Sequence, residues 1–140
     1  MSAEPRPVGL TASAGWEVGA RRTVDLTSAE AWALLTSPTG LRCWLGALEA
    51  WKLEPGASYS LLDGTTGEVR VVSDSHLRIT WKPLGWERAS TIQVRALTNG
   101  QRSVLAFHQE HLPNAWARSE RRAFFHAALD SLEALAAESA

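Results

Sequence analysis

Hydrophobic and polar residues alternate from residue 16 to residue 26, which is the pattern of a strand with one buried face. The residues of one parity are mostly apolar: Trp16, Val18, Ala20, Arg22, Val24 and Leu26. The other parity is polar: Glu17, Arg21, Thr23 and Asp25. The alternation predicts a half-buried strand, with Arg22 as a polar residue on its inward face.

Two short helices are predicted directly after this strand. Thr27, followed three residues later by a glutamate, has the spacing of a capping box, in which both side chains accept hydrogen bonds from backbone N–H groups at the start of a helix. Ser37 followed by Pro38 is a second start signal, because proline at the first helical position loses no hydrogen bond. We therefore expect helices over residues 28–36 and over residues 38–45, the second ending at a glycine.

Turn residues divide the middle of the chain into short segments with the composition of strands. The turn signals are Pro55-Gly56, Asp63-Gly64, Ser73-Asp74, Pro83 to Gly85 and Asn99-Gly100. The strands expected between them lie near residues 47–53, 57–62, 67–73, 76–82, 90–97 and 102–110. This spacing predicts an antiparallel meander, and Asn-Gly is its strongest hairpin signal.

A long helix is predicted after Pro113, with Asn114 as its cap and no glycine or proline in the remaining sequence. Its apolar residues repeat at intervals of four and three positions: Phe125, Leu129, Leu132 and Ala136. This stripe must pack on another apolar surface. A length of about 20 residues corresponds to about 30 Å of helix.

One strand, two short helices, six strands and one long helix predict an α+β domain, with helices on one face of an antiparallel sheet of six or seven strands. A twisted sheet of this width is too broad for one helix to cover, so we expect a pocket between sheet and helix. We assign this domain to residues 15–137. Residues 1–14 contain two prolines and no periodicity, and we expect them to form a flexible leader.

Composition and charge exclude several classes of protein. The chain has 140 residues, 45% hydrophobic and 21% charged, which is typical of one globular domain. Its 14 basic and 15 acidic residues give a net charge of −1, so neither nucleic acid nor an anionic membrane is an expected partner. Cys43 is the single cysteine, and no segment has the pattern of a signal peptide or a membrane span. We expect a cytoplasmic protein.

Five stretches of the sequence resemble one superfamily in their order and spacing. They are AWALLTSPTGLRCWLG (31–46), LEPGASYSLLDGTTGEVR (53–70), LRITWKPLGW (77–86), FHQEHL (107–112) and RRAFFHAALDSL (121–132). Over residues 16–135 the chain resembles the START-like, or SRPBCC, superfamily, in the branch homologous to activators of the heat shock protein 90 ATPase. The resemblance implies a helix-grip fold with a pocket for hydrophobic small molecules between the sheet and the last helix. Members include lipid carriers, aromatic cyclases and co-chaperone-like domains, so the fold does not choose among these functions.

The candidate pocket residues are strand residues whose parity turns them toward the last helix, residues of that helix's apolar stripe, and a tryptophan at the end of the second short helix, where we expect the mouth of the fold. They are Arg22, Trp44, Tyr59, Leu61, Val69, Ile79, Trp81, Ile92, Val94, Phe107, Gln109, Phe125 and Leu129. Among the seven tryptophans of the chain, Trp44 and Trp81 are the preferred pocket residues, although packing in an ordinary core explains any one of them as well. The polar members of the set either orient the polar end of a ligand or pair within the protein.

His108, Glu110 and His111 form an H-x-E-H sequence. On a strand, residues three apart project to opposite faces, so the two imidazoles do not easily share one metal ion. We favour histidines paired with carboxylates at the end of a strand, and we predict no metal and no cofactor.

Three arginines and Glu120 crowd the start of the last helix, where the helix dipole disfavours cations. The arginines are Arg118, Arg121 and Arg122. Contact with an acidic partner is one explanation, and a solvated, partly ion-paired helix face is the favoured one.

The leading hypothesis for function is a non-enzymatic domain that binds an apolar or aromatic small molecule, and we assign no catalytic residue. One alternative is a protein-interaction module of the co-chaperone type. Another is a cyclase or dehydratase in which Arg22, Tyr59 or Gln109 polarises a carbonyl group. Trp86 and Trp116 lack core parity and are candidates for a homodimer patch.

Overall fold

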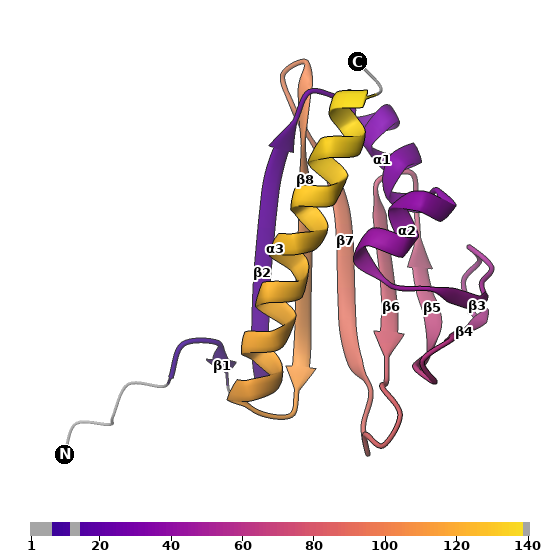
Figure 1. Ribbon diagram of the computed structural model, residues 1–140, viewed down its shortest axis with the longest axis vertical. Helices are drawn as coiled ribbons and strands as arrows, with labels where there is room; N and C mark the ends of the chain where they lie inside the picture. The colour runs from indigo at the N-terminus through magenta and orange to yellow at the C-terminus, as the bar shows by residue number, and fades with distance from the viewer. Residues whose placement is uncertain (1–6, 12–14, 139–140) are drawn as a thin grey trace.

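The computed structural model describes residues 7–11 and 15–138 of the chain (Figure 1). Its elements in chain order are β1 (Leu10–Thr11), β2 (Gly15–Val24), α1 (Ser28–Thr36), α2 (Pro38–Trp44), β3 (Leu48–Ala50), β4 (Ser58–Leu61), β5 (Thr66–Val72), β6 (His76–Trp81), β7 (Ser90–Asn99), β8 (Arg102–Leu112) and α3 (Ala115–Glu138). None of the described helices has the length and hydrophobicity of a membrane span. The predicted order of strands and helices is confirmed from β2 to α3.

The strands form one antiparallel sheet in the order β1-β2-β8-β7-β6-β5-β4-β3. After β2 the chain crosses to the far edge of the sheet through α1 and α2, and it then returns strand by strand until β8 pairs with β2. The pairing places Ala20 opposite Phe107 and Val24 opposite Ser103. The long return from β3 to β8 therefore brings the first and last long strands of the chain side by side.

The two short helices begin at the predicted caps. The Thr27 hydroxyl accepts a hydrogen bond from the Glu30 N–H at 3.2 Å, and the Glu30 carboxylate accepts one from the Thr27 N–H at 3.0 Å. The Ser37 hydroxyl accepts from the Gly40 N–H at 3.0 Å, with Pro38 at the first position of α2. A side chain at position 40 would collide with the carbonyl of Leu34, so only glycine permits this tight connection between α1 and α2.

Helix α3 lies on the face of the sheet that also carries α1 and α2, and it crosses in front of β2 and β8 (Figure 1). Asn114 caps it by accepting a hydrogen bond from the Ala117 N–H at 2.8 Å. The predicted stripe is buried against the sheet, since Phe125, Leu129 and Leu132 have no exposed surface. The protein is thus an α+β domain with the helix-grip fold, as predicted.

Over residues 7–11 and 15–138 the sheet has eight strands, where six or seven were expected. The additional strand is β1, in which Leu10 pairs with Trp16 of β2. It lies in the segment that we expected to be a flexible leader, and residues 1–6 and 12–14 of that segment are outside the described residues.

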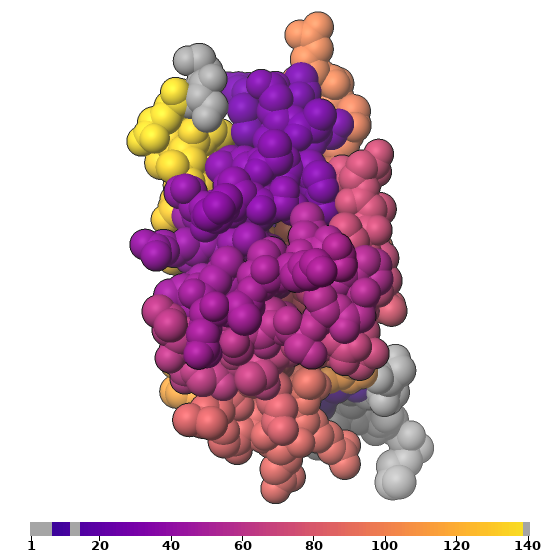
Figure 2. All heavy atoms as spheres, turned by 90° about the vertical axis from the view of Figure 1, so that its right-hand side faces the viewer, coloured from indigo at the N-terminus to yellow at the C-terminus, as the bar shows by residue number. Residues whose placement is uncertain are grey.

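The helices and the sheet close the core on the side of β3. In the view from that side, α1 and α2 lie above the atoms of β3 to β5, and residues of the β6–β7 loop project at the lower end (Figure 2). This lower end, where α3 also begins in Figure 1, is the part of the fold that matters for the candidate site.

Candidate functional site

A row of aromatic side chains runs through the core from α2 toward the β6–β7 loop (residues 82–89). Trp44 lies 5.8 Å from Phe107 between ring centres, and Phe107 stacks on Phe125 at 5.1 Å with an interplanar angle of 11°. At the other end, Trp81 meets Trp86 edge to face at 5.4 Å. The two halves of the row are joined by a cation.

That cation is Arg121, whose side chain enters the core from the second turn of α3. Its guanidinium carbon lies 4.0 Å from the centre of the Trp81 ring, 4.3 Å from that of Phe124 and 4.8 Å from that of Phe125. Only 7% of the residue's surface is exposed. Burial lowers the pKa of Arg121 to about 10, so the guanidinium is still charged at neutral pH.

A chain of hydrogen bonds holds the guanidinium group in place. Arg121 Nε donates to Gln109 Oε1 at 2.7 Å, Gln109 Nε2 donates to Ser90 Oγ at 2.8 Å, and Ser90 Oγ donates to the Trp81 carbonyl at 3.0 Å. The direction of the chain is fixed, because arginine only donates and the amide oxygen of Gln109 must therefore face it. Gln109 and Ser90 have no exposed surface, so this polar relay is fully buried.

Two N–H donors beside this relay have no hydrogen-bond acceptor. Among the described residues, nothing accepts from Nη2 of Arg121 or from Nε1 of Trp81, although both atoms are buried. Trp44 differs, because its buried Nε1 donates to the Leu35 carbonyl at 2.8 Å. Contact with aromatic faces stabilises the cation but provides no acceptor oxygen. A buried donor without an acceptor lowers the stability of the fold. The two donors are therefore suited to an acceptor oxygen that the protein itself does not provide.

Tyr59 is a buried polar group whose needs are met within the protein. Its hydroxyl donates to the Thr80 carbonyl at 2.5 Å. Burial raises the pKa of Tyr59, and the charge of Arg121 acts in the opposite direction. A side chain at Gly67, its cross-strand neighbour, would collide with the tyrosine ring. Tyr59 is therefore fixed by packing and hydrogen bonding.

A cavity of about 620 Å³ opens at the end of the domain where α3 begins, and we call it the mouth cavity. It lies between the β6–β7 loop and the end of β8, and its lining residues are Gly15, Gly85, Trp86, Glu87, Arg88, Ala89, His111, Leu112, Pro113 and Asn114. Trp86 contributes to its wall and also touches Trp81, which stacks on Arg121. His111 adopts a φ of 63°, a strained backbone conformation of a kind that is concentrated at functional sites.

A larger hollow of about 720 Å³ lies mainly on the outer face of the sheet, around Gly19 and Ala106. Exposed arginines line part of it, among them Arg21, Arg95 and Arg122. We prefer the mouth cavity as the candidate site, because Trp86 lines it and packs against Trp81, whose buried Nε1 has no acceptor among the described residues.

The structure brings the predicted pocket residues together, with one exception. Twelve of the thirteen are buried: Trp44, Tyr59, Leu61, Val69, Ile79, Trp81, Ile92, Val94, Phe107, Gln109, Phe125 and Leu129. They form part of a closely packed core, and none of them lines the mouth cavity. Their role in ligand binding stays a prediction.

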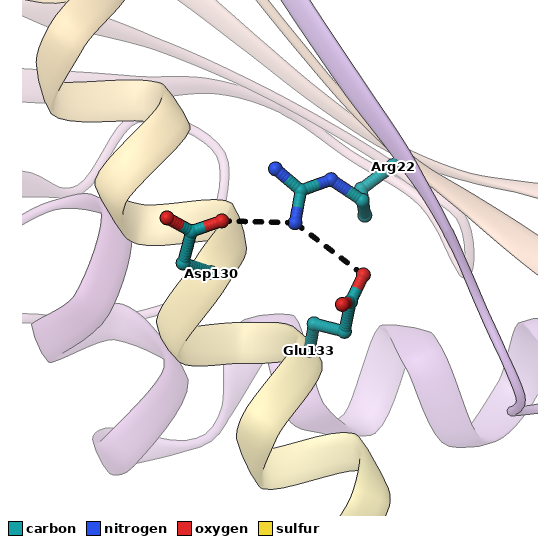
Figure 3. A network of polar contacts seen from close by, with 3 residues as sticks. All are labelled: Arg22, Asp130 and Glu133. Carbon is teal, nitrogen blue, oxygen red and sulfur yellow. Dashed lines mark hydrogen bonds and ion pairs between the residues drawn. The ribbon is translucent and has the colours of Figure 1, made fainter.

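Arg22 is the exception, because its charged end lies at the surface. It faces α3 as the parity predicts, and Nη1 lies 3.0 Å from Asp130 and 3.3 Å from Glu133, both on α3 (Figure 3). The hydrogen bond to Asp130 contributes most to raising the pKa of Arg22. Both carboxylates contact the same nitrogen and hold the charged end of Arg22 at the surface, away from the core.

Arg22→Met is expected to lower the free energy of unfolding by about 1 kcal/mol or less and to leave ligand binding unchanged. Exposed ion pairs contribute little, because water screens them and the long side chains lose conformational freedom. Urea denaturation measures the first effect. A loss above about 2 kcal/mol would contradict a surface role for this network.

The interpretation of the arginine cluster as a solvated helix face is wrong for Arg121. Arg118 lies half-buried and donates from Nε to the Glu17 carbonyl at 2.7 Å, and Arg122 is exposed. Counting back four residues from Phe125 along the apolar stripe leads to Arg121. The helical period therefore places Arg121 on the buried face of α3. Its charge nevertheless favoured the interpretation of a solvated side chain.

The two histidines of the H-x-E-H sequence lie near carboxylates, as favoured from the sequence. His108 Nε2 is 3.6 Å from a carboxylate oxygen of Glu17, and His111 Nε2 is 4.0 Å from one of Glu110.

Comparison with solved structures supports the helix-grip fold. The protein MLL2253 from Mesorhizobium loti is 19% identical and superposes with a TM-score of 0.76, covering 89% of this chain and 98% of its own. CalU16 from Micromonospora echinospora is 21% identical with a TM-score of 0.72, covering 83% and 73%. DynU16, described as a protein in the dynemicin biosynthetic locus, is 20% identical with a TM-score of 0.71, and this chain spans 45% of its length. No curated protein matches the sequence.

The sequence also matches a family model over most of its length. Residues 25–137, from the end of β2 to the last turn of α3, match the model described as Activator of Hsp90 ATPase homolog 1-like protein. The chain therefore belongs to the family of activator of Hsp90 ATPase homolog 1-like proteins.

Proposed function

We propose that this protein is a non-enzymatic helix-grip domain that binds a hydrophobic or aromatic small molecule at the mouth cavity. The observation that carries the proposal is the position of Trp86, which lines that cavity and forms the end of the aromatic row through its contact with Trp81. A ligand that displaces the Trp86 ring would reach Trp81 and the start of α3. The cavity's volume of about 620 Å³ is in the usual range for sites that bind small molecules.

Two further observations support a small molecule as the ligand. The mouth cavity is lined both by charged residues of the loop and by apolar residues such as Leu112 and Pro113. Binding pockets commonly combine the two kinds of residue. DynU16, which shares the fold, is described as belonging to a biosynthetic locus. We place the protein in the cytoplasm, with neither nucleic acid nor membrane among its partners.

The family description favours a second function, that of a co-chaperone-like module that binds a partner protein. An ATPase assay with the chaperone of the same organism separates the two functions. Stimulation of the ATPase without any effect of small molecules would favour the module. The homodimer patch at Trp86 and Trp116 stays a prediction for both: Trp116 is 70% exposed, whereas Trp86 is half-buried against Trp81.

The cyclase or dehydratase hypothesis is not favoured. It requires at least two of Arg22, Tyr59 and Gln109 to face one open cavity. Arg22 is bound to α3, Tyr59 donates to Thr80, and Gln109 is enclosed by the relay.

The proposal is tested by calorimetric titration with 2-naphthamide, lauric acid and progesterone. We expect at least one to bind, and Trp86→Ala to weaken that ligand about tenfold, because an aromatic wall contributes about 1–2 kcal/mol. Trp116→Ala is the matched control, since it removes an exposed tryptophan from the first turn of α3. The absence of binding by all three compounds, or equal effects of the two variants, would count against the mouth cavity.

A further inference from the structure

We infer that the ligand carries a carboxylate, or another anionic oxygen on a flat aromatic body, and that Arg121 Nη2 and Trp81 Nε1 bind that oxygen. The inference rests on the proposed function and adds the chemical class of the ligand. It goes beyond an apolar pocket, because it requires one charged contact at a defined place in the core.

The first step is the missing negative charge. Arg121 is a buried cation, and among the described residues no carboxylate forms an ion pair with it. Within the described part of the chain, its one hydrogen-bond partner is the neutral amide of Gln109. Its neighbour Glu120 is exposed to solvent. Arginine is almost never buried without a counter-charge, so a ligand carboxylate would complete the site.

The second step is the number and placement of the free donors. Nη2 of Arg121 and Nε1 of Trp81 are both buried and unpartnered, and the guanidinium carbon lies 4.0 Å from the centre of the Trp81 ring. A carboxylate has two acceptor oxygens, and arginine binds such groups with high geometric specificity. An apolar ligand would leave both donors unsatisfied.

The third step is preorganisation. The Gln109–Ser90 relay fixes Nε of Arg121, while Trp81 and Phe124 lie against the guanidinium. The cation therefore loses little conformational freedom when a ligand binds, which favours affinity. Trp81 and Trp86, beside the cation, offer aromatic contacts to a flat ring attached to the carboxylate.

The fourth step is access from the mouth cavity. Trp86 lines the cavity and packs edge to face on Trp81, so a ligand that enters from the cavity reaches Trp81 when the Trp86 ring turns aside. The loop that holds Trp86 contains Gly85, with a φ of 90°, and the exposed Leu84. Lys82 is bonded through its backbone to Thr66, but residues 84–85 and 87–89 are exposed, which favours movement in this part of the loop.

The test compares 2-naphthoate with 2-naphthamide at neutral pH, because the two have nearly the same shape and only the first is charged. Calorimetric titration of the whole chain should give about tenfold tighter binding of 2-naphthoate. Arg121→Met should remove this preference, because no buried cation is left to distinguish the two probes, and the control Trp116→Ala should keep it. Gln109→Glu is the second variant, used if Arg121→Met does not fold. It places a carboxylate beside Arg121 and should also remove the preference.

Each other outcome overturns the inference. Equal binding of the two probes by the unmodified protein would reject the charged contact and leave the proposed function standing. A preference for 2-naphthoate that persists in both variants would place the charge recognition elsewhere, for example at Arg88 in the mouth cavity. If neither naphthalene probe binds but lauric acid or progesterone does, the inference of an aromatic carboxylate ligand is rejected and the proposed function is not. Failure of all four compounds would reject the proposed function as well.

Discussion

Phe125→Ala is expected to lower the free energy of unfolding by about 3–5 kcal/mol, which is a large part of the stability of a domain of this size. Phe125 has no exposed surface, and it stacks on Phe107 at 5.1 Å between ring centres. It also lies 4.8 Å below the guanidinium of Arg121. Removing the ring leaves a cavity between α3 and the sheet. The surrounding strands and helix relax only partly, so the cavity is not filled. Urea denaturation followed by circular dichroism measures the change.

Phe124→Ala is the matched control, since it removes the same ring from the neighbouring position of α3. Phe124 is only half-buried, so we expect a loss of less than half that of Phe125→Ala. Similar losses for the two variants would show that the stacked pair with Phe107 is not the centre of the packing between helix and sheet.

Most of the fold could be predicted from the sequence, because each long element buries one face. The alternation in β2 predicted which residues pack inward, and Val18, Ala20 and Val24 are buried. The capping signals placed the starts of α1 and α2 correctly. β1 could not be predicted, because two paired residues are too short to show a period.

The candidate site could be predicted only in part. Parity identified Gln109 as an inward polar residue, and it is buried without exposed surface. Its partner Arg121 was missed, because a charged residue in a helical stripe is usually solvated, and only three-dimensional packing shows the aromatic faces around it. The mouth cavity was missed for another reason. Much of its lining comes from the β6–β7 loop, and loops have no hydrophobic period from which to predict a shape.

The position of Arg121 relates the fold to the proposed function. A core that served stability alone would be filled at position 121 by an apolar residue, since replacing buried charges by hydrophobic groups is often neutral or stabilising. Here a cation occupies that position, and it is supported by Gln109 and Ser90 and in contact with three aromatic rings. This interior cation, with a buried donor that has no acceptor among the described residues, is the observation on which the proposed carboxylate contact rests.

Gln109→Leu is expected to lower the free energy of unfolding by about 3 kcal/mol, although leucine matches glutamine in size. The substitution removes the acceptor for Arg121 Nε and the donor to Ser90 Oγ, which lie 2.7 Å and 2.8 Å away. Both partners stay buried, and the unpaired guanidinium accounts for most of the cost. Urea denaturation of this variant, of Arg121→Met and of the double variant forms a complete cycle.

The double variant distinguishes the relay from ordinary packing. Once Arg121 is methionine, leucine at position 109 leaves no cation unpaired, and Ser90 still donates to the Trp81 carbonyl at 3.0 Å. We therefore expect Gln109→Leu to cost about 1 kcal/mol or less in the Arg121→Met background, compared with about 3 kcal/mol alone. If the two single effects simply add, Gln109 does not act through Arg121, and the buried cation is stabilised by its aromatic neighbours alone. Strong coupling together with a loss of 2-naphthoate binding in Arg121→Met would show that one group of side chains serves both the core and the ligand.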